Sequence, residues 1–286
     1  MKFYAIINRG TNLTTRSMLE ESCRQRGIDF VTLDPKNHDF TSLQAIEPGS
    51  VLYKVSTDPR STTLFAYLVN DKVATVFESP NRAVATYDNV FGASLIHQRS
   101  NLPIIPTVFD LTRDPKKLQN YVERLGGFPI IVKAGGGSHG VGVMKFDSFD
   151  SLKSVTDYLL TRGDKPQFIM RKYIDYAAHA RLIVLGDQVI DSIRYHRVPG
   201  DFRSNVGKDL KVETKSFDRE IERAAIGSVK ALEAEFGGVD ILIDQQGKGY
   251  IAEVNVPCFF PRTQLATGTD IAGALVDHLV KKAARL

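Results

Sequence analysis

The stretch Gly238-Val-Asp-Ile-Leu-Ile-Asp-Gln-Gln-Gly-Lys-Gly-Tyr-Ile-Ala-Glu-Val-Asn255 contains two apolar runs of strand length, 239–244 and 250–255. Between the runs lie acidic, amide and glycine residues in a pattern that is typical of a tight turn. Two apolar runs joined by such a turn predict a β-hairpin. The other motifs of the chain can be interpreted from this hairpin outward.

Three side chains with oxygen donors lie on the predicted hairpin. Pairing of its strands puts Asp240 opposite the region of Glu253 and Asn255. Glu253 and Asn255 are two residues apart and therefore share one face of their strand. Oxygen donors on one sheet face suit a hard cation such as Mg²⁺, which is usually shared with the phosphates of a substrate. The alternative is an edge hairpin whose acids are only solvated.

A second motif is the glycine-rich run Ala134-Gly-Gly-Gly-Ser-His-Gly-Val-Gly142. It lies between two strand-like runs, Phe128–Lys133 and Val143–Phe146. Glycines let backbone N–H groups approach phosphates closely, and Lys133 adds a positive charge. The order strand–loop–strand differs from the strand–loop–helix order of the Rossmann and Walker loops. The run therefore predicts a phosphate-covering hairpin loop, although a plain turn is the alternative.

Together these motifs resemble ATP-grasp enzymes, and most closely the RimK-like carboxylate–amine ligases. The resemblance covers most of the chain and is strongest from about Ser79 onward. The stretches that carry it are Phe128–Gly142, Phe168–Ile174, Gly200-Asp-Phe-Arg-Ser-Asn205, Gly238–Leu242, Glu253–Asn255 and Thr267-Gly-Thr-Asp-Ile-Ala-Gly273.

The resemblance implies a fold of mixed α/β and α+β class, the ATP-grasp fold. A small N-terminal parallel α/β domain, residues 1–85, would precede two α+β subdomains, 86–175 and 176–286, that clamp ATP. Alternating strand-like and helix-like runs in the first part of the chain favour the same parallel domain. The predicted helices are 14–26, 62–70, 81–100, 115–125, 148–162, 218–236 and 269–284, and the predicted strands are 3–7, 28–33, 51–55, 73–77, 167–173, 180–185 and 188–194.

The resemblance also implies roles for individual residues. ATP would contact the strand end and the glycine loop; these residues are Arg171, Lys172, Tyr173, Ile174, Asp175, Lys133, Gly136, Gly137, Ser138, His139 and Gly140. One or two Mg²⁺ ions, with Mn²⁺ as a substitute, would be held by Asp240, Glu253 and Asn255. Catalysis would rest on Lys133, Arg203 and Asn205, with Arg203 also contacting the nucleotide. For Arg203 the alternative is a surface ion pair with Asp201.

Substrate contacts are predicted at Arg181, Arg194, Phe259 and Arg262. An arginine fork can hold a substrate carboxylate, whereas solvated strand residues are the alternative for Arg181 and Arg194. Three positions depart from the family pattern. Lys172 stands where an acidic residue is common, Asn89 stands where a phosphate-binding lysine is expected, and Val256–Arg262 replaces Ala-Ser-Pro-Gly. The last departure predicts an altered, partly apolar acceptor pocket with a cation.

Composition places the chain among ordinary globular proteins. Of its 286 residues 43% are hydrophobic and 24% charged, and the formal net charge is +4. The basic residues are spread along the chain, and tryptophan is absent, so nucleic-acid binding is not expected. Two distant cysteines, an N-terminal apolar run too short for a signal peptide and no apolar run of transmembrane length predict a cytoplasmic, membrane-free protein.

The function that these motifs predict is ATP-dependent amide or peptide bond formation through an acyl phosphate, with release of ADP and phosphate. The substrates would be amino acids, peptides or a protein C-terminal tail, and relatives suggest a homo-oligomer. The alternative is an ATP-grasp protein that binds nucleotide without ligase activity, a sensor or partner subunit, which Asn89 and Lys172 motivate.

Overall fold

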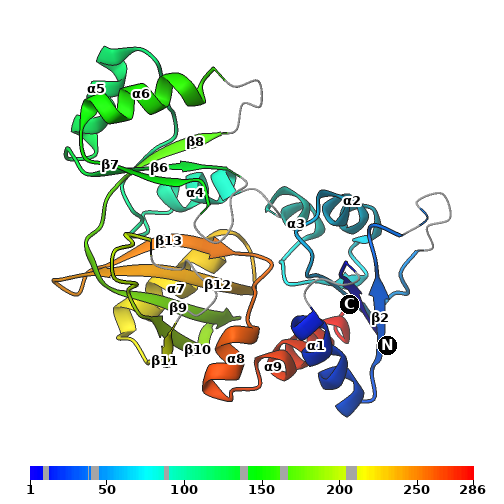
Figure 1. Ribbon diagram of the computed structural model, residues 1–286. Coiled ribbons are helices and arrows are strands. Elements are labelled where there is room, and N and C mark those ends of the chain that lie inside the picture. The colour runs from blue at the N-terminus through cyan, green and yellow to red at the C-terminus, as the bar shows by residue number, and fades with distance from the viewer. Residues whose placement is uncertain are drawn as a thin grey trace.

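The computed structural model describes residues 1–8, 13–37, 39, 45–86, 90–135, 141–161, 167–203 and 211–286. Within these residues the strands form three sheets, one parallel and two antiparallel. Figure 1 shows the parallel sheet to one side of a five-stranded sheet, and the other four-stranded sheet above the latter. The predicted α/β and α+β class is confirmed. No helix in the described ranges is long and apolar enough to cross a lipid bilayer.

The amino-terminal unit is the predicted parallel α/β domain, with strand order β2-β1-β3-β4. Its helix α2 begins three residues before the predicted start at 62. Asp58 accepts a hydrogen bond from the N–H of Arg60, and Pro59 occupies the first helical position. The elements are β1 (Lys2–Ile6), α1 (Leu13–Gln25), β2 (Asp29–Leu33), β3 (Ser50–Lys54), α2 (Pro59–Leu68) and β4 (Val73–Ala74).

The central unit is an antiparallel sheet of order β5-β8-β6-β7, with two helices packed on each other. It has a hydrophobic core of its own, in which Leu118, Ile130, Leu152 and Met170 are fully buried. Figure 1 shows both helices on the side of the sheet that faces away from the rest of the protein. The elements are β5 (Thr107–Val108), α5 (Pro115–Arg124), β6 (Ile130–Ala134), β7 (Val143–Phe146), α6 (Phe149–Leu159) and β8 (Phe168–Lys172).

The carboxyl-terminal unit is an antiparallel sheet of order β11-β10-β9-β12-β13. Helix α7 packs closely on it because Gly249 has no Cβ, which would lie 2.3 Å from Ile221 Cδ1. The elements are β9 (Tyr176–Leu185), β10 (Gln188–Tyr195), β11 (Val212–Thr214), α7 (Arg219–Ala231), β12 (Phe236–Asp244), β13 (Gly249–Asn255), α8 (Pro261–Thr267) and α9 (Ile271–Ala283).

The last helix, α9, joins the two ends of the chain. It packs against α1, β3 and β4, so that one hydrophobic core runs through the amino- and carboxyl-terminal units. Lys282 of α9 donates hydrogen bonds to the carbonyls of Thr75 and Phe77 and pairs with Glu235 at 2.6 Å. The first and last units therefore fold around a common core, whereas the central unit does not share it.

Besides shifts of a few residues at the ends of elements, such as β4 and β9, some helices differ from the sequence predictions. Within the predicted helix 81–100 the structure describes α3 (Pro80–Thr86) and α4 (Val90–Arg99), and residues 87–89 lie outside the described residues. The predicted helix 218–236 ends at Ala231, because Glu233 adopts a positive φ of 53° and the chain then enters β12. Helix α8 was not predicted, although Pro261 stands at its first position and Gly268, with φ of 79°, ends it.

Because the amino- and carboxyl-terminal units share one core, a substitution in that core should destabilise the strands of both units. Leu275 of α9 is fully buried in it, and Leu275→Ala should lower the free energy of unfolding by about 2–5 kcal/mol. Hydrogen exchange should accelerate in β1 and β3 as well as in β9 and β12, but not in β6 and β8. The matched variant Leu152→Ala, in the central core, should accelerate exchange in β6 and β8 alone. The same pattern for both variants would contradict two separate cores.

Candidate active site

The hairpin β12–β13 has the predicted register. Asp240 pairs with Glu253 and Gly238 pairs with Asn255, so the three predicted oxygen donors lie on one face of the sheet. The register then steps to Ile251 opposite Ile241, which makes Ala252 the extra residue of a β-bulge. Two carboxylates directly opposite each other repel, and the surrounding cations must compensate for this.

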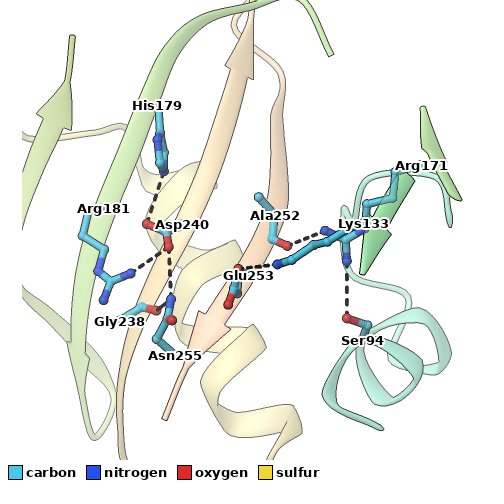
Figure 2. Close-up of polar contacts among 10 residues, drawn as sticks. All are labelled: Ser94, Lys133, Arg171, His179, Arg181, Gly238, Asp240, Ala252, Glu253 and Asn255. Atoms are coloured by element: carbon cyan, nitrogen blue, oxygen red, sulfur yellow. Dashed lines mark hydrogen bonds and ion pairs between the residues drawn. The ribbon is translucent and has the colours of Figure 1, made fainter. Parts of the chain in front are cut away.

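Asp240 is buried and held by three side chains. Arg181 Nη1 donates to Asp240 Oδ2 at 2.7 Å, Asn255 Nδ2 donates to the same oxygen at 3.0 Å, and His179 Nε2 lies 3.2 Å from Oδ1. Burial raises the pKa of Asp240, but the charge of Arg181 and these hydrogen bonds outweigh it, so the pKa lies below its ordinary value. Asp240 is therefore a fixed carboxylate (Figure 2).

The side chain of Arg181 reaches Asp240 across a glycine. A Cβ on Gly238 would come within 2.6 Å of Arg181 Nη2, so only glycine leaves room for the guanidinium. In the structure Arg181 donates to the carboxylate of Asp240, while its predicted contact with a substrate carboxylate stays a prediction. His179 was not predicted. It lies two residues before Arg181 and therefore faces the same way, a spacing that could have revealed it.

Lys133 comes from the central unit to complete this group. It lies near the end of β6, and its Nζ donates to Glu253 Oε2 at 2.7 Å, although the two residues are 120 positions apart. The side chains are 18% and 30% exposed, so the pair is accessible to a ligand from the cavity beside it. In this row two acids, Asp240 and Glu253, lie between two bases, Arg181 and Lys133 (Figure 2).

A cavity of about 140 Å³ lies between the central and carboxyl-terminal units. Its lining combines apolar side chains such as Ile105, Ile131 and Leu242 with charged ones. Among the residues predicted from the sequence, those that line it are Lys133, Arg171, Lys172, Tyr173, Ile174, Arg203, Asp240 and Glu253. Tyr176, His179 and Phe202 line it as well and were not predicted. A cavity lined by both apolar and charged side chains suits a nucleotide.

The residues 171–175, which were predicted to contact ATP, have different surroundings in the structure. Asp175 does not line the cavity and pairs with Arg197 at 3.1 Å; Arg197 also donates to the Tyr173 hydroxyl at 3.2 Å. Arg171 turns toward β13, where Nη1 donates to the carbonyl of Ala252 at 2.8 Å. Burial lowers the pKa of Arg171, and the negative charge of Glu253 acts in the opposite direction. Lys172 is exposed at the strand end.

Arg203 forms the ion pair that was the alternative for it, while its predicted catalytic and nucleotide-binding role stays a prediction. Its Nη2 donates to Asp201 Oδ2 at 2.8 Å and its Nε to Oδ1 at 3.0 Å, which is the ion pair that the sequence left open. The same side chain lines the cavity. Hydrogen bonds from Arg203 lower the pKa of Asp201, so both groups carry charge at neutral pH. Asp201 thus holds the guanidinium at the cavity edge.

The remaining predicted substrate residues, Arg194, Phe259 and Arg262, do not line the cavity. Arg194 donates to the carbonyl of Ala177 at 3.0 Å and lies 3.5 Å from Glu213. Arg262, in α8, interacts with Tyr195, and the Phe259 side chain is 51% exposed. The predicted residues Gly136, Gly137, Ser138, His139, Gly140 and Asn205, and the departure at Asn89, lie outside the described residues.

The donor set fits a magnesium ion. Asp240, Glu253 and Asn255 supply hard oxygen ligands on one face. Asn255 donates both to Asp240 and, at 3.4 Å, to the carbonyl of Gly238, which turns its amide oxygen the other way. A carboxylate has about four lone-pair positions, and the three contacts of Asp240 leave one for a cation. The described residues hold no cluster of three or more His, Cys, Asp and Glu that would compete as a metal site.

Comparison with known proteins places this arrangement in a family. Residues 88–279 match the model of the RimK-like ATP-grasp domain. A probable alpha-L-glutamate ligase from Shewanella loihica is 26% identical over 293 residues, which cover 98% of this chain and 95% of the relative.

Two solved structures have the same fold. The ATP-grasp ligase PsnB, complexed with a phosphomimetic variant of a minimal precursor, Mg and ADP, gives a TM-score of 0.73 at 18% identity over 98% of each chain. D-alanine–D-alanine ligase from Bacillus anthracis, complexed with ATP, gives 0.71 at 15% identity over 100% of this chain and 97% of the ligase. Since the family model spans more than half of the sequence, the chain belongs to the RimK-like ATP-grasp family.

Proposed function

We propose that this chain is an ATP-dependent ligase that joins a carboxylate to an amine through an acyl phosphate and releases ADP and phosphate. The observation that carries the proposal is the contact of Lys133 with Glu253 beside Asp240, all three of which line the cavity. A lysine and two carboxylates in this arrangement match the phosphates and the cation of magnesium–ATP. The names of relatives, glutamate ligase and D-alanine–D-alanine ligase, support the same reaction class.

The residues of the cavity would divide the work as follows. Lys133 would exchange Glu253 for phosphate oxygens, and Glu253, Asp240 and Asn255 would then present their oxygens to the cation. When bound, Mg²⁺ supplies positive charge that neutralises the phosphates during transfer. Arg203, held by Asp201, would grip the transferred phosphoryl group with its planar fork.

The chemistry proceeds in two displacements. An oxygen of the substrate carboxylate attacks the γ-phosphorus, the bond to the bridging oxygen breaks, and ADP leaves. The amine then attacks the acyl carbon and phosphate leaves. Positioning and charge stabilisation are the contributions of the protein in both steps. Loop 135–142 would exclude water from the acyl phosphate, a role that stays a prediction.

The substrates that we propose are an amino acid or peptide carboxylate and an amino-acid amine. The glutamate ligase name of the relatives supports an amino acid, and the precursor bound by PsnB supports a peptide. Phe259 and Arg262, beyond Asn255 on the chain, remain our candidates for the acceptor pocket.

Loss of the Glu253 carboxylate tests the metal role. Glu253→Gln should lower Mg²⁺-dependent ADP formation by about 10²–10³-fold, since a preorganised charged group is lost at the phosphates. ADP release would be followed with a panel of amino-acid and peptide pairs. Glu213→Gln is the control, because Glu213 pairs with Arg194 away from the cavity.

An equal loss in both variants would contradict the assignment of Glu253. Nucleotide binding by calorimetry, with no ADP from any acid–amine pair, would favour the alternative of a nucleotide-binding protein without ligase activity.

The Lys133–Glu253 pair predicts competition between lysine and metal in the free protein. Lys133→Met leaves Glu253 without its cation, so Mn²⁺ should bind the nucleotide-free variant more tightly while ADP binds more weakly. The expected changes are about 5- to 150-fold, the usual range for coupled sites. Electron paramagnetic resonance of free Mn²⁺ and calorimetry with ADP measure them.

The control is Lys153→Met, which removes a half-buried lysine paired with Asp157 within α6. Weaker Mn²⁺ binding to Lys133→Met would mean that Lys133 does not compete with the cation for Glu253.

A further inference from the structure

The strand that carries Glu253 is irregular at the residue before it. In β13, Ala252 is the extra residue of a bulge, with Glu253 opposite Asp240 on one side and Ile251 opposite Ile241 on the other. Side chains alternate between the two faces of a strand, so adding or removing one residue turns all later side chains over. The bulge at Ala252 therefore decides that Glu253 shares a face with Asp240.

β13 is also an edge strand, and edge strands lack a neighbour that would fix such a bulge. On its outer side the linker before β5 pairs with one residue of β13: Ile251 N–H donates to the carbonyl of Pro103 at 2.8 Å, and the carbonyl of Ile251 accepts from Ile105 N–H at 3.4 Å. One residue further, the outer partner is a side chain. Arg171 Nη1 donates to the carbonyl of Ala252 at 2.8 Å. The bulge is thus held by the guanidinium of a residue from the central unit.

Arg171 is anchored at two points. Its Nη2 donates to Ser94 Oγ of α4 at 3.3 Å, so one planar side chain ties β8, α4 and β13 together (Figure 2). Its Nε is shielded from solvent and has no hydrogen-bond partner within the described part of the chain. Burying a guanidinium with an unpaired donor is costly, and the two contacts that it does make end at the strand of Glu253 and at α4.

We propose that Arg171 is a positioning residue: it holds the Ala252 bulge in place and thereby orients Glu253 toward the cation and the phosphates. The proposal rests on the proposed function for the identity of the ligand, whereas the bulge and its contacts do not. This positioning role differs from the role that the sequence predicted for Arg171, which was a contact with ATP. Ala252 and Arg171 line the cavity together with Glu253, so the bulge and the arginine that contacts it form part of the cavity wall.

The test compares Arg171→Met, Arg171→Lys and Arg124→Met. Arg171→Met keeps the length of the side chain and loses its charge and its donors, and Arg171→Lys keeps the charge with a single donor group. Arg124 is an exposed arginine at the end of α5 and serves as the matched control.

In the ligand-free protein, hydrogen exchange followed by mass spectrometry should accelerate about 10- to 100-fold in the segment 249–255 of Arg171→Met, the effect of losing one hydrogen bond from a charged donor. Exchange in β9 and β10 should stay unchanged. Mn²⁺ affinity, by paramagnetic resonance with ADP present, should fall about 10- to 100-fold, as for groups that orient metal ligands. Arg171→Lys should recover part of both effects, and Arg124→Met should show neither.

Three results would overturn the proposal. Faster exchange throughout the carboxyl-terminal sheet, with a lower melting temperature and unchanged Mn²⁺ affinity, would mean a purely structural role. A weaker affinity for ADP in the absence of metal, with normal hydrogen exchange at 249–255, would mean that Arg171 contacts the nucleotide, as the sequence predicted. Unchanged hydrogen exchange and unchanged Mn²⁺ and ADP affinities would mean that the bulge is stable without the Arg171 contact. None of these readouts requires turnover, so a failure of the ligase assignment would be seen separately.

Discussion

Registered pairing of three neighbouring strands is the constraint on which the site depends. It places Arg181 of β9, Asp240 of β12 and Glu253 of β13 in one row, and Lys133 reaches the end of that row from the central unit. Two carboxylates opposite each other in a sheet repel, and a cation at each end of the row offsets this repulsion. The row therefore consists of charged side chains on a rigid sheet. A ligand can displace its outer cation, Lys133, from Glu253.

Each end of the row has its own support. Asp240 is buried, and a buried carboxylate is stable only when it is paired and hydrogen-bonded, which Arg181, His179 and Asn255 ensure. Arg181 in turn needs the space left by Gly238. At the other end Glu253 is partly exposed, and its direction follows from the bulge that Arg171 contacts. The buried pair Arg181–Asp240 is thus fixed, whereas the partly exposed pair Lys133–Glu253 can separate when a ligand binds.

The division into cores fits this asymmetry. The amino- and carboxyl-terminal units share a continuous core through α9, whereas the central unit packs around its own. At the cavity, Lys133 and Arg171 of the central unit make polar contacts to β13, beside a small apolar cluster that includes Ile105 and Ile174. Polar contacts between separately packed units are replaced by a ligand at lower cost than a common apolar core would be. Nucleotide sites between domains commonly use this arrangement.

The sequence alone determined the local elements, since strand alternation, the turn at 244–249 and the order of helices and strands are written in neighbouring residues. It also indicated Lys133, Asp240, Glu253 and Asn255 as one group through the resemblance of their motifs. Tertiary structure decided what lies beside them. The capture of Arg181 by Asp240, the contact of Arg171 with Ala252 and the pairing of Asp175 with Arg197 depend on strand register and on the packing of one unit against another. Such contacts join residues that are far apart in the chain, and no local pattern encodes which distant partner a charged side chain will meet.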